Sequence, residues 1–278
     1  MADYLRPTSL DEALAALSDR PWTMLAGGTD VYPATVGRPI TADVMDVTGL
    51  PSLRTISVDD GVVRIPALAT WTDVVRADLP PAFDGLKAAA RSIGGVQIQN
   101  RGTLAGNLCN ASPAADGLPN LMALDARVEL SSASGRREMA VGEFVVGNRR
   151  TVRRPDELVT AILVPLPSRS ARSAFLKLGS RAYLVISIAS VATVVDVGPD
   201  GVVVAARIVV GACSEVPMRI LPAEAQLVGE AGSPSLAEPI EPADVADLAP
   251  IDDVRGTAAY RRDVALTLVR RAVAEVLA

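Results

Sequence analysis

The sequence predicts an α+β fold in two parts, and three observations support this prediction. Its 278 residues are 49% hydrophobic and 21% charged, which is enough apolar material for a sizeable core. Helical and β-prone segments are mixed through the first half, whereas strands followed by helices end the chain. Two prolines and several polar residues interrupt the apolar pattern at 164–170. We therefore expect one domain over residues 1–167, with subdomains of about 1–55 and 56–167, and a small α+β domain over residues 171–278.

The first domain carries distinct helix and strand signals. Ser9 can cap a helix that begins at Leu10, with Glu12 reaching back to the cap. Residues 96–119 show little periodicity and are predicted to be irregular, a form of segment that is usually functional inside a compact domain. The other expected elements are a β-prone run at 22–25, a strand at 44–47, a hairpin around 59–61, a helix at 81–93, a short helix at 121–124, and a hairpin of 127–131 with 136–141.

The second domain is predicted to begin with a strand meander. Its strands are expected at 171–178, 186–197 and 202–211, with a turn at Pro199-Asp200-Gly201. Two helices follow, the last over 257–278, and residues 234–250 have the composition of an acidic linker. The longest largely apolar stretch, 184–195, has the length of a core strand and is too short for a membrane span.

Charge and composition exclude several classes of function. The chain has 27 Lys+Arg against 32 Asp+Glu, a net charge of −5, and no basic stripe, so nucleic-acid binding has little support. It has no histidine, which excludes Ser-His-Asp and Cys-His catalysis. Cys109 and Cys213 cannot by themselves build a four-thiolate metal site. We therefore expect no metal in this chain, an organic cofactor as any redox centre, and a reducing, cytoplasmic setting.

Two glycine-rich turns are the candidate binding elements. One is Leu25-Ala26-Gly27-Gly28-Thr29-Asp30-Val31, and the other is Thr103-Leu104-Ala105-Gly106-Asn107 with its extension to Asp116. Either could direct successive backbone N–H groups at an anion such as a pyrophosphate, and either alone could be a simple tight turn. Neither has the spacing of the dinucleotide-binding or phosphate-loop motifs.

Four segments carry a family resemblance. Residues 24–31 and 98–116 resemble the two flavin-binding loops of the FAD-binding, medium subunit of molybdenum hydroxylases, the xanthine dehydrogenase and carbon monoxide dehydrogenase family. Residues 175–181 and 253–262 are similar to two further signatures of that family. The resemblance implies a two-part FAD-binding domain of the vanillyl-alcohol-oxidase/PCMH type, followed by a small α+β C-terminal domain.

The resemblance also implies which residues contact FAD. The two loops would hold the diphosphate and ribityl chain through backbone amides, Leu163 and Lys177 would lie near the isoalloxazine ring, and no side chain would act as a general base. The implied cofactor-binding residues are Met24, Leu25, Ala26, Gly27, Gly28, Thr29, Asp30, Val31, Ile93, Thr103, Leu104, Ala105, Gly106, Asn107, Asp116, Leu163 and Lys177.

Some of these residues also have simpler interpretations. Asp116 could cap the helix that begins near Gly117, and Lys177 could be an ordinary solvated lysine. Ala105 stands where the family has a glycine. Alanine would be strained there if the glycine supplies a positive φ, and costs little if the glycine only gives clearance, which is the expectation.

The resemblance implies an electron-transfer subunit of an oxidoreductase complex. A large partner would carry molybdopterin, a small partner would carry iron–sulfur clusters, and FAD in this chain would pass their electrons to an external acceptor. Two such heterotrimers would form a dimer. The alternatives are a stand-alone FAD-dependent oxidoreductase of the same superfamily and a flavin-free scaffold subunit.

Overall fold

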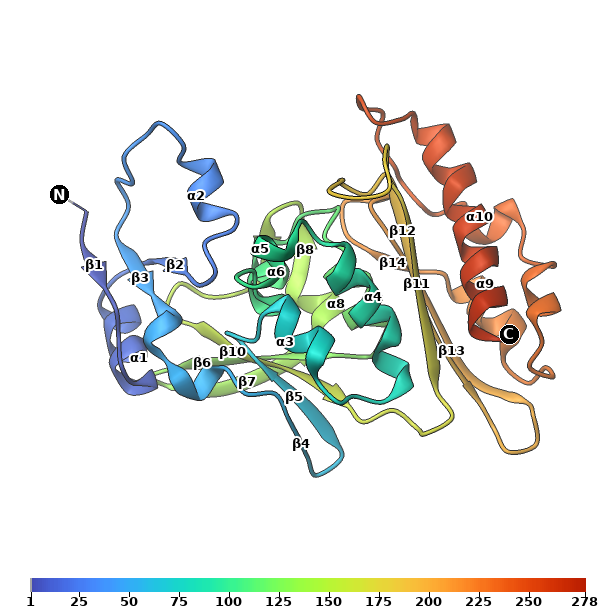
Figure 1. Ribbon diagram of the computed structural model, residues 1–278, viewed down its shortest axis with the longest axis horizontal. Coiled ribbons are helices and arrows are strands. Elements are labelled where there is room, and N and C mark those ends of the chain that lie inside the picture. The colour runs from blue at the N-terminus through green and yellow to red at the C-terminus, as the bar shows by residue number, and fades with distance from the viewer. Residues whose placement is uncertain (1) are drawn as a thin grey trace.

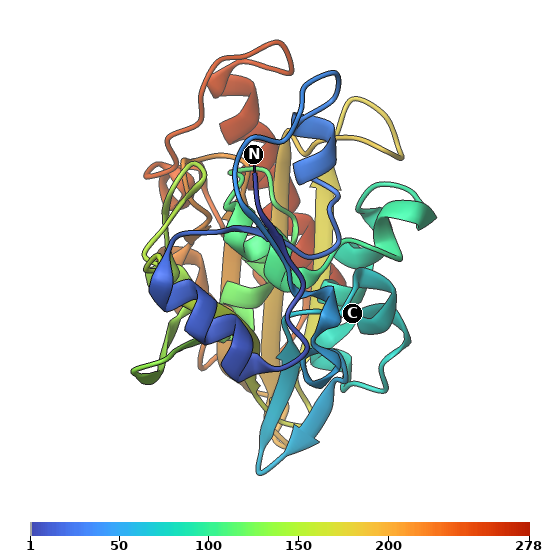
Figure 2. The ribbon, with the colours of Figure 1, turned by 90° about the vertical axis from the view of Figure 1, so that its left-hand side faces the viewer.

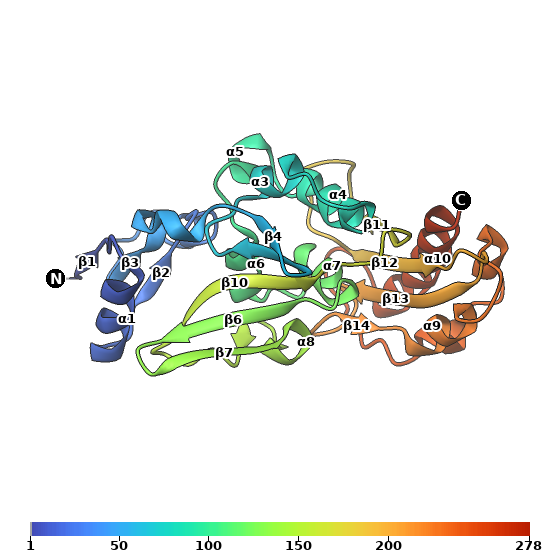
Figure 3. The same ribbon diagram turned by 90° about the horizontal axis from the view of Figure 1, so that it is seen from below.

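Residues 2–278 are described by a computed structural model, in which three parts follow one another along the long axis (Figure 1). The N-terminal part lies at one end, a sheet with several helices occupies the middle, and a second sheet with two helices forms the other end. Figure 3 shows the same order from below.

A three-stranded parallel sheet forms the N-terminal part, in the order β1-β3-β2. Helix α1 (Leu10–Asp19) packs Ala13, Leu14 and Leu17 inward. The Ser9 hydroxyl accepts a hydrogen bond from the Glu12 backbone N–H at 3.2 Å, which confirms the predicted cap. The Glu12 carboxylate does not reach back to Ser9 as predicted, because it accepts a hydrogen bond from the backbone N–H of Thr8. The remaining elements are β1 (Tyr4–Leu5), β2 (Thr23–Leu25), α2 (Val31–Ala34), β3 (Val44–Asp46) and the 3₁₀ turns Val47–Gly49 and Pro51–Leu53.

The middle part is built on a five-stranded antiparallel sheet in the order β4-β5-β10-β6-β7. Strand β10 (Leu158–Pro165) lies between two hairpins, β4–β5 and β6–β7, both of which the sequence predicts. Several helices lie to one side of this sheet (Figure 3). The strands are β4 (Ser57–Asp59), β5 (Val62–Pro66), β6 (Arg127–Ser132) and β7 (Gly135–Ala140), and the helices are α3 (Trp71–Arg76), the 3₁₀ turn Pro81–Phe83, α4 (Asp84–Ser92), α7 (Gly117–Ala123) and α8 (Val141–Phe144).

The prediction of an irregular segment at 96–119 is wrong. This stretch contains α5 (Val96–Gln99), α6 (Leu104–Asn110) and the start of α7. Thr103 caps α6, because its hydroxyl accepts a hydrogen bond from the backbone N–H of Gly106 at 2.9 Å. These helices are too short for a 3.6-residue apolar period to repeat, so the periodicity test cannot detect them.

The C-terminal part is a four-stranded antiparallel meander of β11 (Arg172–Leu178), β12 (Ala189–Val197), β13 (Val203–Gly211) and β14 (Met218–Arg219), which confirms the predicted strand order. Helices α9 (Leu221–Leu227) and α10 (Ala258–Val276) cover one face of this sheet (Figure 1). Helices α4 and α7 of the middle part pack against it from the other side. The sheet is therefore shared between two layers of helices.

The acidic stretch 234–250 does not behave as a linker. It forms the 3₁₀ turns Pro234–Ala237 and Pro242–Val245, and the first of them packs against α10. Ala237, Ile240, Val245 and Leu248 are buried among its acidic residues. Isolated apolar residues thus anchor a segment whose composition alone resembles a linker.

Two hydrophobic cores lie on either side of the C-terminal sheet. The larger core spans the first two parts and also includes Phe175, Val194 and Val209 from the sheet. The smaller core contains Val191, Ile208, Val269 and their neighbours under α10. Strand β10 ends at Pro165 and β11 begins at Arg172, and the division of the chain at 167 and 171 stays a prediction.

One ion pair on the middle sheet, between half-exposed Arg64 and buried Glu129, is expected to make stability depend on pH. Both oxygens of Glu129 accept hydrogen bonds from Arg64, at 2.9 and 2.7 Å, and the Thr160 hydroxyl also donates to this carboxylate. The hydrogen bonds from Arg64 hold the pKa of Glu129 below its ordinary value. A depressed carboxyl pKa stabilises the fold above the unfolded pKa of about 4.3, and this stabilisation is lost as the pH falls through the folded pKa.

We expect Glu129→Gln to lower the free energy of unfolding at pH 7 by about 1–3 kcal/mol, because it removes the charge that Arg64 contacts. The same substitution should reduce the loss of stability between pH 5 and pH 3, measured by urea denaturation at each pH. Glu138→Gln is the control, since Glu138 is 45% exposed where it pairs with Arg127. Equal losses at pH 7 for the two variants would contradict this account.

Candidate functional site

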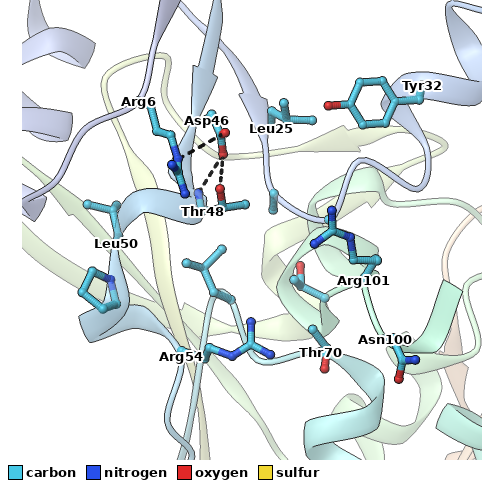
Figure 4. Close-up of a pocket in the computed structure, with 15 residues that line it drawn as sticks. Arg6, Leu25, Tyr32, Asp46, Thr48, Leu50, Arg54, Thr70, Asn100 and Arg101 are labelled. Atoms are coloured by element: carbon cyan, nitrogen blue, oxygen red, sulfur yellow. Dashed lines mark hydrogen bonds and ion pairs between the residues drawn. The ribbon is translucent and has the colours of Figure 1, made fainter. Parts of the chain in front are cut away.

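A cleft of about 340 Å³ lies between the N-terminal part and the middle part (Figure 4). Leu25, Ala26 and Gly27 line it from the first glycine-rich turn, and Thr103 lines it from the start of α6. The structure therefore brings residues from both predicted flavin-binding loops to one cavity. Its remaining lining comes from Arg6, Tyr32, Asp46, Thr48, Leu50, Pro51, Arg54, Leu68, Thr70, Asn100 and Arg101.

The two loops touch through backbone at Gly27. A Cβ placed on Gly27 would lie 1.8 Å from the carbonyl oxygen of Arg101, so only glycine permits this approach. Gly28 has a φ of +73°, in the left-handed region that favours glycine. The turn after β2 therefore needs two glycines for two different reasons, one for clearance and one for backbone conformation.

Ala105 is accommodated without strain. It lies in the first turn of α6 with helical backbone and is buried. The position therefore does not require a positive φ, and the clearance expectation holds. Gly106 follows it, and a Cβ there would lie 2.8 Å from the hydroxyl oxygen of the Thr103 cap.

Three arginines give the cleft a positive potential, namely Arg6, Arg54 and Arg101. Figure 4 shows Arg54 and Arg101 extending toward the cavity from facing segments, and Arg6 paired with Asp46. Burial alone would raise the pKa of Asp46, but hydrogen bonds from Thr48 and Tyr4 outweigh it and hold that pKa below its ordinary value. Arg54 is likewise paired with Asp73, at 3.2 Å, so the three arginines exceed their two carboxylate partners by one positive charge, which suits an anionic ligand such as a diphosphate.

Beyond the cleft, Asp116 and Lys177 form a buried ion pair between the middle and C-terminal parts. Lys177 Nζ lies 2.7 Å from Asp116 Oδ2, and their side chains are 11% and 6% exposed. The hydroxyl of Ser187 donates to Asp116 Oδ1 at 2.5 Å. The Asp116 side chain makes no capping bond to α7, so the helix-cap interpretation is wrong, and Lys177 is not an ordinary solvated lysine.

Lys177 retains a hydrogen-bond donor for a ligand. Its ammonium group donates to Asp116 and, at 3.2 Å, to the carbonyl oxygen of Val185. An ammonium group has three donors, so these two bonds leave one available.

Asn107 provides a test of whether these residues fit a cofactor. Its Oδ1 atom is buried and has no hydrogen-bond partner within residues 2–278. The same atom would lie 2.7 Å from a Cβ on Gly117, the residue after Asp116. A buried amide oxygen normally has a partner, and a hydroxyl-bearing ligand chain running from the cleft toward Asp116 would supply one. The residues present thus fit an extended cofactor with an anionic and a hydroxyl-rich portion.

Ile93 and Leu163 are two further predicted site residues, and they lie apart from the residues described above. Ile93 ends α4 half-buried, next to Gly94, and its role stays a prediction. Leu163 lies near the end of β10, where it pairs with Arg64 of β5 and Arg127 of β6. Along the strand it is three residues, or about 10 Å, after Thr160. The carbonyl oxygen of Thr160 accepts a hydrogen bond from the backbone N–H of Ala67, the residue before the cleft-lining Leu68. Thr160 is therefore the β10 residue nearest this part of the cleft, and the structure does not bring Leu163 to it.

Several site residues were not found from the sequence. Ser187 interrupts an apolar run, which is the one local signal that a buried polar role exists there. Arg54 carries no signal of its own, since exposed arginines are common, and Arg101 lies in the second flavin-binding loop but was not singled out there. They become recognisable only when the cleft brings them together.

The fold and the site are those of a flavoprotein-type subunit, with two glycine-rich loops that meet at a cleft. The family model described as the FAD binding domain in molybdopterin dehydrogenase matches residues 1–167, and the model described as the CO dehydrogenase flavoprotein C-terminal domain matches residues 174–276. The chain belongs to this family of FAD-binding medium subunits of molybdenum hydroxylases.

Individual relatives agree with this assignment. The chain is 34% identical to the nicotinate dehydrogenase FAD-subunit of Eubacterium barkeri, over 82% of this chain and 79% of the relative. It is 32% identical to the glyceraldehyde dehydrogenase medium chain of Sulfolobus acidocaldarius, over 98% and 97%. A solved structure of reconstituted CO dehydrogenase from Oligotropha carboxidovorans aligns with a TM-score of 0.91 and 29% identity, over 100% of this chain and 98% of that one.

The helices of residues 2–278 include none with both the length and the apolar surface needed to cross a membrane.

Proposed function

We propose that this chain is the FAD-binding, electron-transfer subunit of a molybdenum hydroxylase complex. The observation that carries the proposal is the meeting of two glycine-dependent loops at a cationic cleft, from which α6 leads to the buried pair of Asp116 and Lys177. The membership of this chain in the family of FAD-binding medium subunits also supports FAD as the cofactor.

The chain's residues would bind and orient the cofactor. Residues 24–31 and 103–107 would approach the diphosphate and ribityl chain through backbone, with Asn107 supplying a side-chain partner. Lys177, oriented by Asp116 and Val185, would direct its remaining donor at the ring system. When bound, FAD supplies the electron-accepting and electron-donating chemistry. No side chain of this chain is needed as a general base.

The partners we propose are a small iron–sulfur subunit and a large molybdopterin subunit, assembled as a dimer of heterotrimers. The relatives include medium chains and a medium subunit of dehydrogenases and a hydroxylase, which supports a multi-subunit complex. Two unpaired cysteines, Cys109 and Cys213, are consistent with the cytoplasmic setting proposed for it.

The absorption spectrum of the purified chain tests the cofactor assignment. We expect two flavin bands, with FAD released on denaturation. A chain stripped of its flavin should take up FAD but not FMN, because FMN lacks the adenylate half and therefore the diphosphate that the cationic cleft would contact. A chain that stays colourless after incubation with FAD would contradict the assignment and favour a flavin-free scaffold.

Purification under native conditions tests the complex. We expect a larger and a smaller subunit to accompany the chain, with molybdenum and iron in the assembly. A flavin-loaded chain that oxidises a small substrate by itself would instead support a stand-alone oxidoreductase.

A further inference from the structure

A short hairpin far along the chain reaches both glycine-rich loops. Strands β8 (Val145–Gly147) and β9 (Arg150–Thr151) form it, and Arg149 lies at its tip. Arg149 Nη1 donates to Asp30 Oδ2 at 3.0 Å and to Asn110 Oδ1 at 2.6 Å. We call these three side chains the Arg149 clasp. Asp30 belongs to the first loop and Asn110 to the end of α6, so one guanidinium joins the two.

The backbone around the clasp is in an uncommon conformation. Arg149 has a φ of 54° and Ala111 a φ of 47°, both in the left-handed region that non-glycine residues seldom adopt. The backbone N–H of Arg149 donates to the carbonyl oxygen of Ala111 at 2.8 Å, so the two residues face each other. Ala111 ends α6, where a left-handed residue is a common helix ending, and Arg149 turns the hairpin opposite it.

The hairpin is also anchored to the C-terminal part. The backbone N–H of Asn148 donates to Glu215 Oε1 at 3.2 Å, in the segment between β13 and β14. This hydrogen bond connects the tip of the hairpin to the C-terminal part.

The clasp changes the role expected of Asp30. Its Oδ2 accepts from Arg149 and its Oδ1 accepts from the Asn110 amide at 3.4 Å, so both oxygens face the clasp. The Arg149 and Asp30 side chains are 59% and 52% exposed, and an exposed ion pair contributes little to global stability. What the clasp determines is the spacing of the two loops, which meet again through backbone at Gly27 and Arg101.

We propose that Arg149 is a positioning residue that holds the two flavin-binding loops together, and that this contact slows the release of FAD. This rests on the proposed function. The predicted contact of Asp30 with the cofactor then becomes an indirect one, through the position of its loop.

The release rate of FAD from the flavin-loaded protein tests the proposal, followed by the rise in flavin fluorescence after dilution. Arg149→Gln should release FAD about twofold to fivefold faster, which is the size of effect that an exposed ion pair can have. Arg150→Gln, at the neighbouring exposed arginine, is the matched control and should release FAD at the wild-type rate. Arg149→Lys should rescue the rate only in part, because an ammonium lacks the planar fork that spans two acceptors.

A double-mutant cycle decides whether Arg149 acts through Asp30. If it does, Arg149→Gln combined with Asp30→Asn should release FAD no faster than the faster single variant. The apo-protein melting temperature should be unchanged in Arg149→Gln, which separates loop positioning from a general loss of stability. Additive effects of the two substitutions, or a wild-type release rate in Arg149→Gln, would overturn the proposal. A wild-type protein that retains no FAD would instead contradict the proposed function itself.

Discussion

Substitution of Gly27 by alanine is expected to weaken FAD binding at least tenfold, equivalent to about 1.4 kcal/mol. The added Cβ would lie 1.8 Å from the Arg101 carbonyl oxygen and 2.5 Å from its carbon. Because the obstacle is backbone, no rotamer change can relieve it, and the two loops must separate. Titration of the stripped protein with FAD measures the effect.

Gly142→Ala is the control for this substitution. Gly142 is an exposed residue of α8, and a Cβ there would meet only the terminal methyl of Met122 at an ordinary 3.4 Å. It should bind FAD with wild-type affinity. Wild-type affinity in Gly27→Ala would show that the close approach of the loops does not shape the flavin site.

Lys177→Met is expected to lower both stability and the midpoint potential of the bound flavin. It leaves the Asp116 carboxylate buried without its cation, a change that costs about 3–5 kcal/mol when the remaining charge is fully buried. It also leaves a net negative charge beside the proposed ring position, which disfavours electron uptake. We expect the potential to fall by about 30 mV or more, since 30 mV corresponds to about 1.4 kcal/mol for a two-electron couple. Chemical denaturation and a redox titration measure the two effects.

The double variant Asp116→Asn with Lys177→Met separates charge from side-chain identity. It removes both charges, so it should recover part of the stability and part of the potential relative to Lys177→Met. Lys87→Met, at a half-exposed position of α4, should change neither quantity. A wild-type potential in Lys177→Met would remove this lysine from the flavin site.

The elements that the sequence predicted are those with local signals. Ser9 caps α1, and the residues around Asp60-Gly61 turn a hairpin, because side-chain and glycine chemistry act over three or four residues. The short helices α5 and α6 have no such length. The position of β10 depends on pairing with β5, about a hundred residues earlier in the chain, and with β6, about thirty residues earlier. Pairing between strands that are far apart in the sequence produces no recognisable pattern in the residues around either strand.

The same difference between local and non-local signals applies to the candidate site. The two glycine-rich loops were found because glycine marks close approach, and Asp116 and Lys177 were named by resemblance alone before the structure joined them. Ser187 and Arg149 contribute through contacts with residues 71 and 119 positions away, respectively. A single sequence does not encode such partners in any pattern of spacing.

The place of β10 in the middle sheet also determines the order in which a newly made chain can be completed. The β4–β5 and β6–β7 hairpins leave the ribosome first, yet each exposes an unpaired edge until residues 158–165 emerge and fill the gap between them. Lys177 and Ser187 are synthesised later still. A flavin site that includes Lys177 and Ser187 would therefore be complete only after the five-stranded sheet has been synthesised.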